Sequence, residues 1–176
     1  MLYLYTMKIK KLLLLLWIAT IFVACTDSKI KDIPLTASLM IERVYVPFRE
    51  HGYSTVYPKV ITTQEIFDSF LAEINEQNGW NNKVEFISVL KNAKIDFSKR
   101  NILLYRITET SGSVDLYIQE PVLSKDKSRI SVQIDREVPD IGTSDMAYYA
   151  LVYSVDKRIK EIAFKYGQEL ISMKNK

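Results

Sequence analysis

Two different spacings of apolar residues divide the chain into a helical middle and β-rich flanks. Between Thr62 and Gly79, apolar side chains recur at helical spacing with acidic residues opposite, which is the pattern of an amphipathic helix. Thr62 and Glu65 have the capping-box spacing of a helix start, and Gly79 is typical of a helix end. Residues 83–92 predict a second, weaker helix. The predicted apolar faces consist of Ile66, Phe67, Phe70, Leu71 and Ile74 in the first helix and Val84, Ile87 and Leu90 in the second.

Most of the remaining chain has the alternation or the β-branched and aromatic content of strands. The predicted strands are residues 39–48, 55–61, 101–108, 113–119, 129–137 and 146–155. Residues 159–173 fit either a helix or a strand pair, and the alternation of Ile162, Phe164 and Tyr166 favours the strands. Short turns between successive strands indicate antiparallel pairing. The sequence therefore predicts an α+β domain, an antiparallel sheet of about five to seven strands with one or two helices packed on one face.

The N-terminal segment has the parts of a bacterial export signal. Lys8, Lys10 and Lys11 precede an apolar stretch of about 13 residues that ends at Ala24, directly before Cys25. A cysteine after such a small residue resembles a bacterial lipobox. The resemblance implies cleavage before Cys25, a diacylglycerol thioether on its sulfur, and a mature chain that begins there.

An uncleaved membrane helix is the alternative for this segment. Its apolar stretch is shorter than the roughly 20 residues that cross a bilayer as a helix, and the polar residues 26–28 follow instead of a cationic cluster. We therefore expect residues 1–24 to be a lipoprotein signal peptide and acylated Cys25 to hold the protein in the bacterial cell envelope. Thr26, the residue after the cysteine, favours the outer membrane by the enteric sorting pattern.

Removal of the signal changes the charge of the protein. The whole chain has 24 Lys and Arg against 21 Asp and Glu, and the three excess cations lie in the signal. A neutral mature chain lacks the basic excess on which nucleic-acid binding depends. Because acylated Cys25 is the only cysteine, no disulfide is expected. The chain that remains after removal of the signal is long enough for one hydrophobic core. We therefore expect a single domain over residues 38–176, preceded by a polar tether over residues 25–37.

An ordered set of landmarks over residues 60–156 resembles a known domain. A helix of the form Thr-x-x-Glu-x-Phe is followed by Asp96-Phe97-Ser98, a Pro-x-x-Gly turn at 139–142 and a tyrosine-rich strand at 147–155. This order resembles the PrcB-type domain (protease complex subunit PrcB C-terminal-like), named after a lipoprotein subunit of a bacterial surface protease complex. The resemblance implies a partner protein, for which a protease is one candidate. The Thr-Gly-Gly-aromatic turn usual in the family is Thr-Ser-Gly-Ser at 110–113 here.

The residue types on which most enzyme sites depend are scarce. His51 is the single histidine, and its charged and glycine neighbours indicate a solvated turn rather than a catalytic base. One histidine and one acylated cysteine cannot supply a tetrahedral metal site, and the chain has no glycine-rich phosphate loop. Carboxylates are too numerous to indicate a particular glycosidase pair. We therefore expect no enzymatic activity, no metal and no cofactor.

Tyrosine is the one unusual enrichment, with 11 residues in the chain. Tyrosine combines apolar area with a polar tip and suits interfaces. Tyr149 and Tyr153 share the expected buried register of the 146–155 strand, so we assign them to the core. Tyr53, Tyr57 and Tyr148 are the candidate partner-binding residues, although a place in the core is equally compatible with their positions.

Two functions of different classes follow. The first is a membrane-tethered, non-enzymatic lipoprotein that binds or stabilises another envelope or secreted protein, with the 146–153 strand face and the Gly52–Tyr57 turn as its contact. The alternative is an envelope small-ligand-binding protein or a weak carboxylate-based hydrolase. The alternative predicts a deep pocket lined by at least two converging acids.

Overall fold

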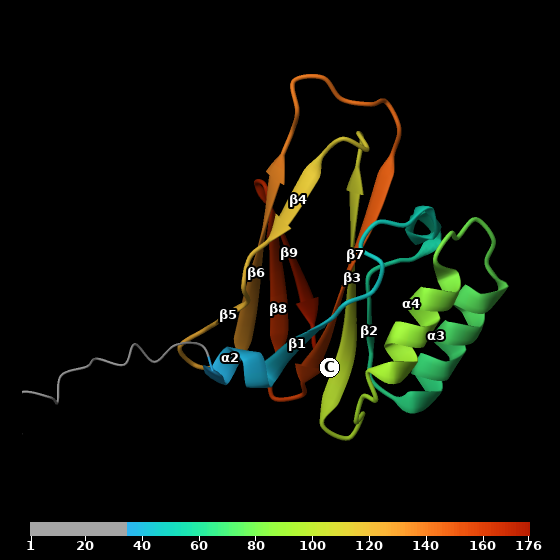
Figure 1. The fold of residues 1–176 in the computed structure, drawn as a ribbon. Coiled ribbons are helices and arrows are strands. Elements are labelled where there is room, and N and C mark those ends of the chain that lie inside the picture. The colour runs from blue at the N-terminus through green and yellow to red at the C-terminus, as the bar shows by residue number, and fades with distance from the viewer. Residues whose placement is uncertain (1–34) are drawn as a thin grey trace, which may run out of the picture. The chain divides into compact units, whose positions relative to one another are not determined.

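The computed structural model describes residues 35–176, and their strands form two sheets (Figure 1). The predicted signal peptide, Cys25 and most of the predicted tether lie outside the described residues. Sheet A has the order β1 (Ile41–Val44), β7 (Ala147–Asp156), β3 (Arg100–Glu109) and β2 (Lys59–Ile61). Sheet B has the order β4 (Asp115–Ile118), β6 (Arg129–Glu137), β8 (Glu161–Tyr166) and β9 (Glu169–Lys174), with β5 (Val122–Leu123) also paired to β6.

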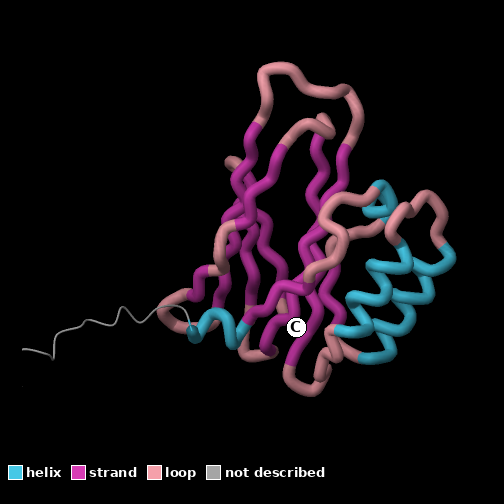
Figure 2. The backbone as a smooth tube through the Cα atoms, in the orientation of Figure 1, coloured by secondary structure: helices cyan, strands magenta, loops and turns pink. Residues whose placement is uncertain are grey.

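The helical elements accompany sheet A. α3 (Gln64–Glu76) and α4 (Lys83–Asn92) pack on the face of sheet A that is turned away from sheet B (Figure 2). A short helix α2 (Leu35–Met40) precedes β1, and a 3₁₀ helix η1 (His51–Thr55) lies between β1 and β2. No helix in this part of the chain is long and apolar enough to cross a membrane.

The fold is therefore layered as sheet B, sheet A and helices, with an apolar core on each side of sheet A. β3 and β7 lie in the middle of sheet A and contribute side chains to both cores, so their residues are buried at even and odd positions alike. The core between the sheets includes Leu103, Tyr105, Val132, Ile134, Tyr149, Leu151, Tyr153 and Phe164. The core under the helices includes Tyr53, Ile61, Phe70, Ile74, Phe86, Leu104 and Val152.

The α+β class predicted from the sequence is confirmed, and so is the C-terminal strand pair, now β8 and β9. The strands divide between two sheets because both faces of sheet A are apolar and each needs a covering layer. All strand pairs are antiparallel except β6 with β8. Between them the chain crosses to sheet A as β7, so β6 and β8 run in the same direction.

Several details of the predicted elements are wrong, including the strand expected over 55–61, which is confined to Lys59–Ile61. Residues 35–40 form a helix, and the strand expected over 39–48 is confined to Ile41–Val44. The cap of α3 is Thr63, whose hydroxyl accepts a hydrogen bond from the Ile66 amide at 3.3 Å. Helix α3 therefore begins one residue later than expected. Ile66, which we expected on the buried face, lies in the first turn and is exposed.

Helix α4 is rotated relative to the predicted apolar face. Its buried residues are Phe86 and Leu90, four residues apart, whereas Val84 is exposed to solvent. Phe86 packs against Tyr53 and Trp80, with ring centroids 5.6 and 5.1 Å apart. The large aromatic side chain determines which face is buried, because it contributes more apolar area than valine.

Candidate functional site

The three tyrosines predicted to bind a partner have different surroundings. Tyr53 is completely buried in η1, and its hydroxyl donates a hydrogen bond to the Pro47 carbonyl. Its ring packs edge-on against Trp80 at 5.2 Å. The assignment of Tyr53 to a partner surface is therefore wrong, because a 3₁₀ turn directs the side chain into the core beneath the helices.

The structure brings the other two tyrosines to one part of sheet A. Tyr57 is 70% exposed, and the Arg106 guanidinium lies 5.5 Å from its ring centroid. Tyr148 is half-buried beside the His51 ring at 5.9 Å. Arg106 pairs with Ala150 and Thr108 with Tyr148, so Arg106 and Tyr148 share a face as diagonal neighbours. Arg106 already donates to the Ser54 carbonyl at 3.0 Å, so its charge is partly engaged.

The predicted contact along the 146–153 strand is also corrected. β7 is an inner strand of sheet A, paired with β1 on one side and β3 on the other. Residues Ala147 and Tyr149–Val155 are buried. A partner cannot reach that face without removing a whole layer of the protein.

A different group of residues has the features of a binding site, and we call it the arginine–aromatic site: Arg43, Tyr45, Phe48, Tyr149 and Tyr153. Arg43 in β1 stands directly opposite Tyr153 in β7, so the two side chains lie next to each other on the face turned toward sheet B. The Arg43 guanidinium carbon lies 5.2 Å from the Tyr45 ring centroid and 5.5 Å from that of Phe48. Such cation–π contacts hold the guanidinium in place.

The charge of Arg43 has no ionic partner among the described residues. Its guanidinium makes two ring contacts and acts electrostatically on Tyr153, and no carboxylate or carbonyl of the described residues accepts a hydrogen bond from it. The side chain is half-buried and Tyr45 is 75% exposed. A guanidinium with five free N–H donors is suited to bind a carboxylate with two parallel hydrogen bonds.

The Tyr153 hydroxyl beside Arg43 is also unpartnered. The oxygen is buried and has no hydrogen-bond partner in the described part of the chain. Burial raises the pKa of Tyr153 to about 12, while the nearby positive charge of Arg43 acts in the opposite direction. The phenol is therefore neutral at physiological pH and retains a proton that it can donate.

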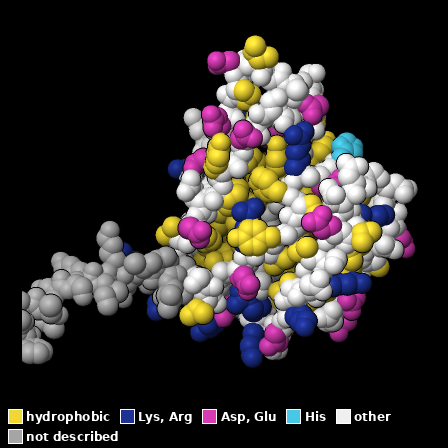
Figure 3. Space-filling view, in the orientation of Figure 1, with side chains coloured by type: hydrophobic (Ala, Val, Ile, Leu, Met, Phe, Trp, Pro, Cys, Tyr) yellow, Lys and Arg dark blue, Asp and Glu magenta, His cyan; other side chains and the backbone are white. Residues whose placement is uncertain are grey.

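Aromatic packing continues from this pair along the edge of sheet A. The rings of Phe48 and Tyr149 are 5.1 Å apart, and the Tyr149 hydroxyl donates to the Val114 carbonyl at 3.1 Å. That carbonyl belongs to the segment leading into β4, so this contact joins the two sheets. Figure 3 shows hydrophobic side chains gathered over the space between the sheets on this face. The arginine–aromatic site thus combines an apolar surface with one positive charge that forms no ion pair among the described residues.

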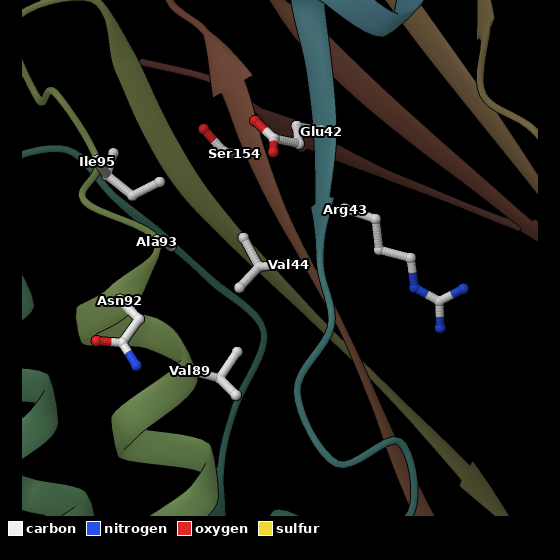
Figure 4. Close-up of a pocket in the computed structure, with 8 residues that line it drawn as sticks. All are labelled: Glu42, Arg43, Val44, Val89, Asn92, Ala93, Ile95 and Ser154. Carbon is white, nitrogen blue, oxygen red and sulfur yellow. The ribbon is translucent and has the colours of Figure 1, made fainter.

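A hollow of about 290 Å³ lies on the opposite face of β1, between that strand and α4. Val44, Val89, Ala93 and Ile95 supply its apolar wall, and its other lining residues are Glu42, Arg43, Asn92 and Ser154. Figure 4 shows the Arg43 side chain pointing to the other side of β1 from the α4 residues. The two faces of one short edge strand therefore have different chemistry.

The comparisons with known proteins give no relative. No protein-family model matches the chain, and no similar protein was found among curated proteins or solved structures. The resemblance to the PrcB-type domain therefore stays a prediction. Within the described residues, no cluster of three or more His, Cys, Asp and Glu side chains is arranged to hold a metal ion.

Sequence reasoning did not single out Arg43, although a signal was present. Arg43 and Tyr45 are two residues apart in a predicted strand, which places them on the same face. An arginine next to an aromatic residue on one strand face is typical of protein-binding surfaces.

Proposed function

We propose that the protein is a membrane-tethered, non-enzymatic lipoprotein that binds or stabilises another envelope or secreted protein through the arginine–aromatic site. The observation that supports this proposal most strongly is the half-buried side chain of Arg43, whose guanidinium has no ionic partner among the described residues. An anionic group of a partner would supply the ionic partner that this guanidinium lacks.

The composition of the site supports a protein as the partner. Arginine and tyrosine are enriched in the centres of interfaces, where they lose water and contribute a large share of the binding free energy. Tyr45 offers an exposed ring, and Phe48 and Tyr149 supply an ordered aromatic base behind it. A side chain that is held before binding loses less conformational freedom on binding.

The hydrolase alternative receives less support. It requires two converging carboxylates in a deep pocket, whereas Glu42 is the one acid among the residues that line the hollow beside β1. The neighbouring Arg43 site offers a cation and phenol groups, which bind anions but do not form the acid pair of a glycosidase. We therefore favour binding over hydrolysis. A protease partner, as the PrcB-type resemblance implies, is one candidate among envelope proteins.

The proposed tether is acylated Cys25, and its test is independent of the binding site. Replacing Cys25 by serine removes the thiol that would carry the lipid. We expect the parent chain to incorporate labelled palmitate and fractionate with membranes, and the Cys25→Ser variant to do neither. Equal labelling and equal fractionation of the two chains would refute the tether.

The binding function is tested in the native envelope with a photo-crosslinking amino acid at position 45. Tyr45 is exposed at the arginine–aromatic site. The matched control carries the same crosslinker at the exposed Lys165 of β8 in sheet B. We expect a reproducible protein adduct from position 45 that position 165 does not give. The proposal fails if mass spectrometry finds no protein that recurs at position 45.

A further inference from the structure

We infer that the partner contributes an extended, acidic segment that pairs with the free edge of β1 and places a carboxylate against Arg43. This inference rests on the proposed function and specifies the chemistry of the partner. It depends on three independent observations, which are the unpaired edge of β1, the different chemistry of its two faces, and the lack of an ion pair to Arg43 among the described residues.

The first observation concerns the backbone. β1 is the outer strand of sheet A, and only its β7 side is paired with another strand of the described chain. The N–H and C=O groups of an edge strand that point away from the sheet can pair with an added strand. β1 has four residues, and the Val46 amide donates to the Val44 carbonyl at 2.9 Å where the strand ends. The backbone hydrogen bonds between β1 and an added strand are therefore few, and side-chain contacts must determine which partner segment binds.

The second observation concerns the two faces of β1. Successive side chains of a strand alternate between faces, and those of an added strand would alternate in the same way. The face carrying Arg43 leads to the arginine–aromatic site, whereas the face carrying Val44 leads to the hollow against α4. A segment paired with β1 would place one side chain near Arg43 and the next near the apolar wall of the hollow. The expected pattern is an acidic residue flanked by small apolar residues.

The third observation concerns charge. The Arg43 guanidinium offers hydrogen-bond donors without an acceptor among the described residues. A carboxylate can accept two parallel hydrogen bonds from the guanidinium, one on each oxygen. Tyr45 partly covers this position through its contact with the guanidinium, and its exposed ring can rotate aside.

A second copy of this chain is the less suitable occupant of the edge. In a symmetric antiparallel pairing centred on Arg43, the arginines of the two copies would stand opposite each other, and like charges opposite each other destabilise a sheet. Charged residues at an edge strand are a common protection against self-association. The same charge favours an acidic partner.

The test uses the purified full-length chain in detergent micelles and the probe peptide acetyl-Thr-Val-Glu-Val-Thr-amide. Two further peptides carry Gln or Lys in place of the central Glu. NMR titration would give the affinities, and hydrogen exchange would report protection of the outward-facing amides of β1. We expect the Glu peptide to bind about tenfold more tightly than the Gln peptide, which is the effect of one charge-assisted contact. Binding should also slow exchange at β1.

Variants of the protein separate the effect of the Arg43 charge from the effect of removing any one positive charge. Arg43→Gln should remove the preference for the Glu peptide, and Arg43→Glu should reverse it in favour of the Lys peptide. Lys165→Gln, which removes one positive charge from β8, should retain the preference. Equal affinity of the Glu and Gln peptides, absence of binding, or exchange that is unchanged at β1 would overturn the inference.

The outcomes for the inference and for the proposed function are distinguishable. A recurring protein adduct at position 45 together with a peptide that does not bind β1 would retain the binding function and refute strand addition. Adducts formed only with other copies of the chain, or only with its own residues 25–34, would overturn the proposed acidic partner segment.

Discussion

The hydroxyl groups of Tyr53 and Tyr153 are both buried, but only that of Tyr53 has a hydrogen-bond partner among the described residues. Removing a satisfied buried hydrogen bond costs about 1 kcal/mol, whereas removing an unsatisfied buried hydroxyl is close to neutral or stabilising. We therefore expect Tyr53→Phe to lower the free energy of unfolding by about 1 kcal/mol and Tyr153→Phe to leave it unchanged or raise it.

Denaturant unfolding of the two variants under identical conditions measures this difference. Each substitution removes one oxygen from a buried ring, so each serves as the control for the other. A loss of stability in Tyr153→Phe that equals the loss in Tyr53→Phe would show that the Tyr153 hydroxyl has a partner in the free protein.

Glu50 makes a pH-dependent contribution to stability. Burial acts to raise the pKa of its carboxyl, but hydrogen bonds from the backbone amides of Asn81, Asn82 and Gly52 together outweigh this effect and lower the pKa below the ordinary value of 4.5. The ionised form is therefore favoured in the folded protein. Its stabilising contribution is complete above the unfolded pKa and is lost as the pH falls through the lower, folded value.

Replacing Glu50 by glutamine should lower the free energy of unfolding by about 1–3 kcal/mol at neutral pH, since a hydrogen-bonded buried charge is lost. The difference between the two proteins should shrink as the pH falls below about 4.5. Glu76→Gln, an exposed carboxylate at the end of α3, is the matched control. A stability difference that is constant from pH 7 to the acid range would contradict this account of Glu50.

The burial of a single side chain could be predicted where a long regular strand determines which residues alternate between its two faces. Tyr149 and Tyr153 lie in the core as expected, because β7 is ten residues long and its register is uninterrupted. Tyr53 was not predictable, since the 3₁₀ helix η1 is a short element whose phase depends on its contacts with Trp80 and Phe86.

At the scale of elements, the spacing of apolar residues predicted most helices and strands. It led us, however, to expect that each strand buries only one of its two faces. Residues 102–105 of β3 are apolar at every position, and all are buried. A continuous apolar run of this kind is typical of a strand covered on both faces. If the apolar runs of β3 and β7 are interpreted as strands covered on both faces, they predict a second layer of strands on the face that the helices leave open.

The contact between η1 and the segment that connects α3 to α4 can be tested by a substitution at Gly52. A β-carbon added to Gly52 would overlap the indole ring of Trp80, which lies against it. Gly52→Ala should therefore displace Trp80 and lower the free energy of unfolding by about 1–3 kcal/mol, as overpacking of a core does.

Denaturant unfolding and tryptophan fluorescence in a Trp17→Phe background would measure both effects, because Trp80 is then the one tryptophan left. Gly142→Ala is the control, since its added β-carbon would meet only the Ser111 side chain. An unchanged emission spectrum in Gly52→Ala would show that the indole is not packed on Gly52.

At the scale of the whole molecule, the sequence could not show how the strands divide between sheets. The parallel pairing of β6 with β8 depends on β7 crossing to the other sheet, and short turns gave only the expectation of antiparallel neighbours. The arginine–aromatic site depends on the same arrangement. Arg43 and Tyr153 are 110 positions apart in the chain and meet only because β1 pairs with β7.

The neutral charge of the expected mature chain makes the local charge of Arg43 more important for binding. Without a general electrostatic attraction over the surface, association with an acidic partner depends on individual contacts. Raising the ionic strength should then weaken binding only modestly, because a partly buried ion pair is screened less than an exposed one.

The most direct test of the central claim is the yield of the adduct formed in the native envelope by a photo-crosslinker at position 45, compared between Arg43→Gln and Lys165→Gln. Both substitutions remove one positive charge, but only Arg43 lies at the proposed site. We predict that Arg43→Gln reduces the adduct by about tenfold, as loss of one charge-assisted contact would, and that Lys165→Gln leaves it unchanged. Equal adduct yields in the two variants would contradict the account.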